Sequence, residues 1–218
     1  MRYLLSLFCF CLFLGISSAY ASSARDLAEK LQTQAENGDL SAAYKLGLLW
    51  SQGKKVAPDF VTAAEWFERA AQGGYTRAML KIANMYGEGQ GVPQDRQRAI
   101  SWYEKAAQKR STEAMVKLGT IFTAQEDFDT SAYWYEKAAI RGDKDALREL
   151  GSFYYKGTGV HFDLQQAFVW LELAAQKGDY AAKSLQRDIV NRKGQEWGDG
   201  LRQKVNNRMM PEKYWNAR

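Results

Sequence analysis

Few residues of this chain have the types and spacing that catalysis or metal binding requires. His161 is the only histidine, so no second imidazole can share a metal ion with it, and no neighbouring residue equips it as a general base. Cys9 and Cys11 are the only cysteines, and both lie in an apolar N-terminal run. We find no Ser/His/Asp set, no cysteine nucleophile and no cysteine metal site. We therefore predict no catalytic residues, no metal site, no cofactor and no enzymatic activity.

Three carboxylates close together in sequence, Glu126, Asp127 and Asp129, resemble the start of a calcium-binding loop. An EF-hand needs a glycine at loop position 6 and a bidentate glutamate at position 12. Counted from Asp127, those positions hold Ala132 and Ala138. The motif is absent. The paired carboxylates Glu65 and Glu68, on the outer face of a second helix, are expected to be solvated surface groups.

The N-terminal residues have the pattern of a signal peptide. One positive charge at Arg2 precedes a 13-residue apolar run from Leu4 to Ile16, and small residues at Ala19 and Ala21 form a signal-peptidase site. The run is shorter than the ~20 residues that span a bilayer, and the alternative is an uncleaved signal anchor. We expect residues 1–21 to be removed with both cysteines, giving a periplasmic or secreted protein with no stable membrane insertion.

Charge is concentrated at the C-terminal end. Residues 22–182 carry 20 basic and 21 acidic side chains, whereas residues 183–218 carry 9 basic and 4 acidic ones. Nucleic-acid binding would need the cations on one groove or reading helix, so we expect no nucleic-acid partner. We interpret the basic segment as a solvated terminal helix and tail.

Internal repeats determine the fold prediction. Tryptophans recur at steps of 36, 32 and 36 residues: Trp66, Trp102, Trp134 and Trp170. A Leu-Gly or Ile-Ala pair recurs with the same steps, beginning at Leu46, Ile82, Leu118 and Leu150. Each unit contains two stretches with apolar residues at i, i+3 or i+4, and i+7, which is the pattern of an amphipathic helix. We predict two core-facing helices per unit, with the tryptophans packed in the core.

Glycine-rich loops join the two helices in the second and fourth units. Gly89-Gln90-Gly91-Val92 and Gly157-Thr158-Gly159-Val160 each precede an aspartate, Asp95 or Asp163, that we predict to cap the second helix. A phosphate cradle would need a preceding strand and a following Lys-Ser/Thr, and both are missing. Glycines close the turns after most second helices; Arg110 stands in that column, so we expect a different turn there.

The complete pattern, Ala-x3-Leu-Gly-x2-Tyr-x2-Gly-x-Gly-Val-x2-Asp-x3-Ala-x2-Trp-Tyr-x2-Ala-Ala, resembles the Sel-1-like repeat (SLR), a relative of the tetratricopeptide repeat. This resemblance implies an all-α, right-handed α-solenoid of antiparallel helix pairs. We divide the chain into the signal peptide 1–21, a capping helix in 22–41, repeats at 42–77, 78–113, 114–145 and 146–181, and basic capping helices and tail in 183–218.

We expect both ends of the repeat array to depart from the repeat pattern. In the fifth first helix, Gln186-Arg187 replaces Leu-Gly, which predicts a polar exposed face. A last helix over Gln195–Met209 is expected to be interrupted near Gly198 and Gly200. Aromatic and sulfur-containing side chains near the end are expected to fold back on the last core layer: Trp197, Met209, Met210 and Trp215.

The resemblance also implies a function. Proteins of this kind act as adaptors or scaffolds, so we expect a monomeric, exported, non-enzymatic protein that holds a protein partner in the cell envelope or outside the cell. One alternative is an immunity protein that neutralises a toxic effector. Another is the β-lactam-binding or hydrolase role suggested for cysteine-rich relatives, although this chain lacks their cysteines after signal cleavage.

In tetratricopeptide relatives, first-helix residues that are not used in packing form the concave binding wall. Transferred to this chain, they give a groove of apolar anchors among polar residues, with Arg77 and Arg148 positioned to hold carboxylates. The candidate groove residues are Tyr44, Leu48, Arg77, Leu80, Asn84, Val116, Thr120, Arg148, Ser152 and Tyr155.

The signal-peptide assignment predicts that the exported protein begins at Ser22, because Ala19 and Ala21 occupy the −3 and −1 positions of the cleavage site. The intact mass of the exported protein measures this directly. A full-length product embedded in the membrane would contradict it.

Overall fold

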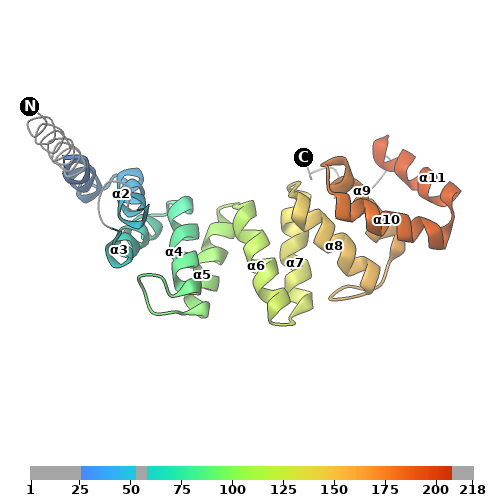
Figure 1. The fold of residues 1–218 in the computed structure, drawn as a ribbon, viewed down its shortest axis with the longest axis horizontal. Coiled ribbons are helices and arrows are strands. Elements are labelled where there is room, and N and C mark those ends of the chain that lie inside the picture. Colours follow the sequence, from blue (N-terminus) through green and yellow to red (C-terminus); the bar gives the residue numbers. More distant parts are fainter. Residues whose placement is uncertain (1–25, 53–57, 208–218) are drawn as a thin grey trace, which may run out of the picture. The chain divides into compact units, whose positions relative to one another are not determined.

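The computed structural model describes residues 26–52 and 58–207, and within these ranges its regular elements are all helices (Figure 1). The all-α fold predicted from the repeats is confirmed: the chain is an α-solenoid of successive helix pairs. The proposed signal peptide 1–21 lies outside the described residues, as do Met209, Met210 and Trp215.

A helix over 26–36 precedes the repeat helices. The repeats and the C-terminal end comprise α2 (Leu40–Gln52), α3 (Phe60–Gln72), α4 (Thr76–Glu88), α5 (Arg96–Gln108), α6 (Thr112–Ala124), α7 (Phe128–Ile140), α8 (Lys144–Lys156), α9 (Leu164–Gln176), α10 (Tyr180–Lys193) and α11 (Gln195–Asn206).

The chain forms two compact units that meet between Ala106 and Ala107, inside α5. In the first unit α2 packs on α3, and α3 packs on α4. In the second unit α6 to α10 pack in sequence order, and α10 also contacts α8. The last helix, α11, packs on both α9 and α10.

In the first, third and fourth pairs, a glycine of the first helix receives a large side chain of the second helix. A Cβ added to Gly47 would lie 2.7 Å from the ring of Phe67, and one added to Gly119 would lie 2.8 Å from the ring of Tyr135. In the fourth repeat, Gly151 stands in the same way against Leu171, at 2.7 Å. These close approaches explain why the glycine of the Leu-Gly pair recurs: the partner side chain occupies the space of a Cβ. We call this arrangement the glycine slot.

The residue that follows the tryptophan is buried in every repeat: Phe67, Tyr103, Tyr135 and Leu171. Trp170 is inaccessible and Trp102 is 8% exposed, but Trp66 and Trp134 are only half-buried. The prediction that all four tryptophans pack in the core is thus wrong for two of them. The Arg69 guanidinium lies over the Trp66 ring, 5.3 Å from its centroid, which is typical of an aromatic ring at the border of the core.

Aspartates begin most second helices, as predicted. The Asp95 carboxylate accepts the Arg98 amide at 3.0 Å, and Asp163 accepts the amides of Gln165 and Gln166. Asp127 likewise caps α7 by accepting the Thr130 amide, so this carboxylate of the supposed calcium loop has a local structural role. Four further aspartates cap helices in the same way: Asp39, Asp59, Asp143 and Asp179.

The turn at Arg110 corrects another prediction. Gly74, Gly142 and Gly178 follow second helices with φ of 96°, 82° and 85°. Arg110 does not produce a different turn: it adopts a left-handed conformation itself, with φ of 65°. The repeat therefore keeps its geometry here at the cost of placing a side chain where glycine is favoured.

The C-terminal end also differs from expectation. Gln186 is not on an exposed face: it is 5% exposed and donates to the buried carboxylate of Glu172 at 2.8 Å. The last helix, α11, is continuous through Gly198 and Gly200. Gly198 is buried against Val190, where an added Cβ would lie 2.7 Å from a methyl group, so it marks close helix packing and not an interruption.

Two glycine-to-alanine substitutions test the glycine slot. Gly119→Ala forces a methyl group into the buried Tyr135 ring, and we expect it to cost about 1–3 kcal/mol of stability. Gly200→Ala lies within α11 with no heavy atom within 4 Å of the new Cβ, so the better helix propensity of alanine should stabilise by about 0.5–1 kcal/mol. Denaturant unfolding midpoints measure both changes. A stabilising Gly119→Ala would refute the steric explanation.

Candidate protein-binding surface

The first unit contains five of the predicted groove residues, on α2 and α4. Tyr44 is packed into its helix pair, with its ring centroid 5.6 Å from that of Phe67 and 5.2 Å from that of Tyr75. Asn84 accepts a hydrogen bond from the Tyr103 hydroxyl. These two residues therefore hold helices together as well as reaching the surface.

Leu48 faces the N-terminal capping helix. It lines an open hollow of about 540 Å³ between the helix 26–36 and α2, together with Leu27, Lys30, Leu31, Gln34, Lys45, Leu49 and Gln52. By contrast, Arg77 is exposed and Leu80 is half-buried on the first-helix face of α4. In this unit, Arg77 and Leu80 fit the predicted role of a binding wall best.

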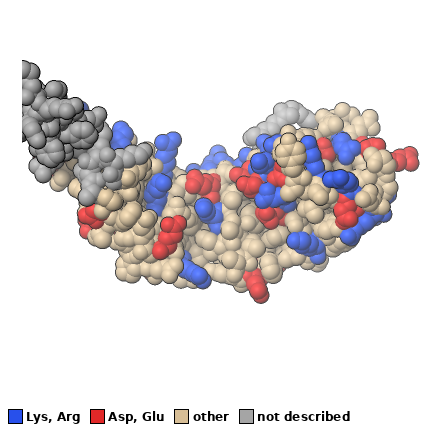
Figure 2. Space-filling view, viewed as in Figure 1, with Lys and Arg blue, Asp and Glu red and all other residues tan. Residues whose placement is uncertain are grey.

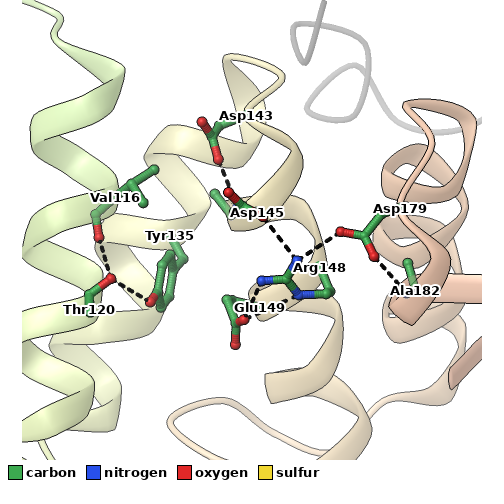
Figure 3. Close-up of polar contacts among 10 residues, drawn as sticks. Val116, Thr120, Tyr135, Asp143, Asp145, Arg148, Glu149, Asp179 and Ala182 are labelled. Carbon is green, nitrogen blue, oxygen red and sulfur yellow. Dashed lines mark hydrogen bonds and ion pairs between the residues drawn. The ribbon is translucent and has the colours of Figure 1, made fainter.

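The other five predicted residues lie in the second unit, on α6 and α8. The Thr120 hydroxyl donates to the Val116 carbonyl at 3.0 Å and lies 3.2 Å from the Tyr135 hydroxyl (Figure 3). The side chain of Val116 is half-buried, whereas Thr120 is exposed. Val116 stands 36 residues after Leu80, at the equivalent position of the next repeat. The repeat therefore places a partly accessible apolar side chain at this position twice.

Arg148 is engaged by carboxylates of its own chain (Figure 3). Its guanidinium lies 2.9 Å from Asp145, 2.9 Å from Glu149 and 2.8 Å from Asp179. Asp179 is 5% exposed and also accepts the Ala182 amide at 2.9 Å, which caps α10. Arg148 thus ties α8 to the start of α10, and its role as a holder of a partner's carboxylate stays a prediction.

The charges of this cluster stabilise one another. Burial alone would raise the pKa of Asp179, but the hydrogen bonds from the Ala182 amide and Arg148 outweigh it and hold the pKa below its ordinary value. Burial also opposes the charged form of Arg148, yet its bonds to Glu149, Asp179 and Asp145 raise its pKa. Both groups are therefore ionised at neutral pH.

At the C-terminal end of α8, the Tyr155 hydroxyl donates to the Asp188 carboxylate on α10. This bond is the main cause of the raised pKa of Tyr155. Arg192 bridges to Asp188 at 3.0 Å and lies over the Tyr155 ring at 5.1 Å. Ser152, between Arg148 and Tyr155 on α8, is half-buried. Arg148 therefore connects α8 with the N-terminal end of α10, and Tyr155 connects α8 with Asp188 farther along α10.

Sequence reasoning missed four strongly exposed apolar or aromatic side chains: Val61, Tyr133, Phe162 and Tyr180, which are 57%, 52%, 59% and 82% exposed. Tyr133 stands where the first two repeats carry Glu65 and Ser101, and Tyr180 stands where three repeats carry Thr76, Thr112 and Lys144. An aromatic residue in a mostly polar column is a signal that could have identified them. His161 is exposed beside Phe162.

The described part of the chain offers no group of three His, Cys, Asp or Glu side chains arranged to hold a metal ion. Among the same residues, no helix combines the length and the apolar character needed to span a bilayer.

The Arg148–Asp179 pair predicts a pH-dependent stability. A depressed carboxylate pKa stabilises the fold fully above the ordinary value of about 3.9, and the contribution disappears as the pH falls through the lower folded value. Asp179→Asn keeps a capping oxygen but removes the charge, so we expect a loss of about 1–2 kcal/mol at pH 7 that shrinks below about pH 4.

Asp145→Asn is the matched control, since it removes an exposed partner of the same arginine and should have little effect. Urea unfolding of the three proteins at several pH values measures the differences. An Asp179→Asn defect that persists unchanged at acid pH would exclude the ion pair as its cause.

Two of the similar proteins found among solved structures are 26% identical to this chain. The first is c5321, a protective antigen present in uropathogenic Escherichia coli strains that displays an SLR fold: 26% identity, TM-score 0.64, covering 87% of this chain and 46% of c5321. This chain therefore spans less than half the length of c5321. The second is a Sel1 repeat protein from Oxalobacter formigenes: 26% identity, TM-score 0.62, covering 78% of this chain and 73% of the other.

A comparison with curated proteins gives no match. The Sel1 repeat family matches four consecutive segments, residues 40–75, 76–111, 112–143 and 144–179. Each segment begins two residues before the repeat start that we assigned from the sequence, and the assignment of the flanking residues stays a prediction. The four segments cover well over half of the chain. The chain therefore belongs to the Sel1 repeat family.

Proposed function

We propose that this protein is an exported, non-enzymatic adaptor that binds a protein partner in the cell envelope through the first-helix faces of its repeats. Sel1 repeat proteins are generally scaffolds for protein–protein interaction. The sequence of residues 1–21 supports the exported location, since it has the basic start, apolar run and small-residue cleavage site of a signal peptide.

The observation that carries this proposal is the pair of half-buried apolar side chains at equivalent first-helix positions, Leu80 on α4 and Val116 on α6. Each is flanked by an exposed polar residue of its own helix, Arg77 before Leu80 and Thr120 after Val116. Apolar anchors within a polar rim are the usual composition of a helical binding surface. Most of the remaining predicted groove residues also hold helices together. We therefore expect them to shape the surface, and expect Leu80 and Val116 to make the main contacts with the partner.

Site-specific photo-crosslinking in cells tests which face binds. A photoreactive residue at Leu80 or Val116 should give discrete protein adducts, because these side chains lie on the proposed binding face. The controls are Glu65 on α3 and Lys137 on α7, which are exposed on second helices of the same two units. Adducts from the control positions alone would place the binding face on the second helices and contradict the proposal.

A complementary substitution tests the contribution of the apolar anchors. We expect Leu80→Asp combined with Val116→Asp to weaken partner capture by at least about 100-fold, since each change places a charge against the bound surface. Neither side chain is fully buried, so helicity and the thermal midpoint should fall only slightly. Glu65→Ala combined with Lys137→Ala should leave capture unchanged. Undiminished capture by the aspartate variant would rule out both positions as binding sites.

A further inference from the structure

The last three helices enclose a groove that the repeat pattern does not explain. It has a volume of about 460 Å³ and is lined by Glu172, Ala175, Gln176, Lys183, Gln186, Arg187, Val190, Asn191, Gln195 and Arg202, from α9, α10 and α11. We call it the C-terminal groove. Its volume lies within the range of ligand-binding pockets in proteins.

The groove lies where a second helix would pack in a complete repeat. Leu147, Leu150 and Gly151 of α8 receive α9, and 36 residues later the equivalent positions of α10 hold Lys183, Gln186 and Arg187. The loop 157–163 separates α8 from α9, whereas Gly194 alone separates α10 from α11. Since so short a connection turns α11 toward α9, the receiving face of α10 is left partly uncovered.

The floor of the groove is a hydrogen-bonded polar network. Glu172 is 7% exposed, and one of its oxygens accepts from Gln176 at 3.2 Å. The other oxygen accepts from Gln186 at 2.8 Å and from Arg202 at 3.3 Å. Its negative charge is therefore compensated by an arginine and by two amide donors, and little of it remains to attract a cation from solvent.

The rim is positively charged and carries an aromatic side chain. Lys183 and Arg187 are exposed and form no ion pair among the described residues. Tyr180 is 82% exposed, one turn before Lys183 on the same face of α10, with the ammonium group 5.3 Å from its ring centroid. Figure 2 shows several blue Lys and Arg side chains over the C-terminal helices, with Asp and Glu among them. Tyrosine and arginine are the residues that most often anchor protein interfaces.

We propose that the C-terminal groove binds an acidic peptide segment of a partner protein. Carboxylates of the segment pair with Lys183 and Arg187, and one apolar side chain packs on Ala175 and Val190 in the groove wall. Tyr180 covers the segment from the rim. Charge complementarity selects this occupant: the free cations face solvent, while the one lining carboxylate is already neutralised. The groove is formed by α9, α10 and α11, whereas Leu80 and Val116 belong to α4 and α6, so either site can exist without the other.

Direct binding to the purified full chain tests this proposal with defined probes. The acidic probe is a pool of short labelled peptides in which Asp or Glu pairs flank one apolar residue. The matched probes are a pool with Lys or Arg in place of each carboxylate, and a short DNA duplex. We expect the acidic pool to bind, the basic pool to show no binding and the duplex to bind at least about tenfold more weakly, a difference of about 1.4 kcal/mol.

A charge-matched pair of variants locates the site. Lys183→Glu combined with Arg187→Glu should weaken binding of the acidic pool by at least about tenfold. Lys193→Glu combined with Lys204→Glu changes the net charge equally on exposed cations outside the groove, and should change affinity by less than about twofold. Circular dichroism melting checks that both variants fold. Equal losses in the two variants, equal binding of the duplex, or no binding of the acidic pool would each overturn the proposal.

Discussion

Close approach between a glycine of one helix and a ring or branched side chain of the next is the interaction on which this fold depends. At Gly47 and Gly119 the partner ring lies where a Cβ would be. Helix backbones can come this near only where the side chain is missing, and the large partner then fills the space at the density of a protein interior. The slot recurs at the repeat spacing in three of the four helix pairs, and in the second pair the small residue Ala83 stands at the same position.

This constraint explains which parts of the fold could be predicted from sequence. Helix pairs, aspartate caps and loop glycines follow from local patterns that repeat, and repetition separates signal from chance. The packed partner of the slot was harder to identify, because Trp66 and its neighbour Phe67 are both large and apolar. Periodicity places both residues near the core, but only the distance to Gly47 distinguishes the fully buried ring from the half-buried one.

For the predicted binding wall, sequence position specifies the helix face but not the intramolecular contacts that each side chain makes. Arg148 lies on the expected face, but three carboxylates surround it, and two of these, Asp145 and Glu149, are so near in sequence that their charge could have been weighed. Asp179 lies 31 residues away, and its contact with Arg148 depends on how α8 packs against α10. Long-range pairing of this kind is a property of the assembled repeats.

The same position of the repeat explains why the helix pairs stop. Where Gly151 admits Leu171, the equivalent Arg187 of α10 brings a long charged side chain that must remain hydrated. A second helix could not dock in the slot without burying that charge, so α11 packs on α9 instead. Gln186, at the position of Leu150, donates a hydrogen bond to the buried Glu172 carboxylate. A polar replacement thus ends the apolar stack. Within the described residues, the cations at this end form no ion pair and lie beside an open groove. They leave a surface whose chemistry suits an acidic partner better than another copy of the repeat.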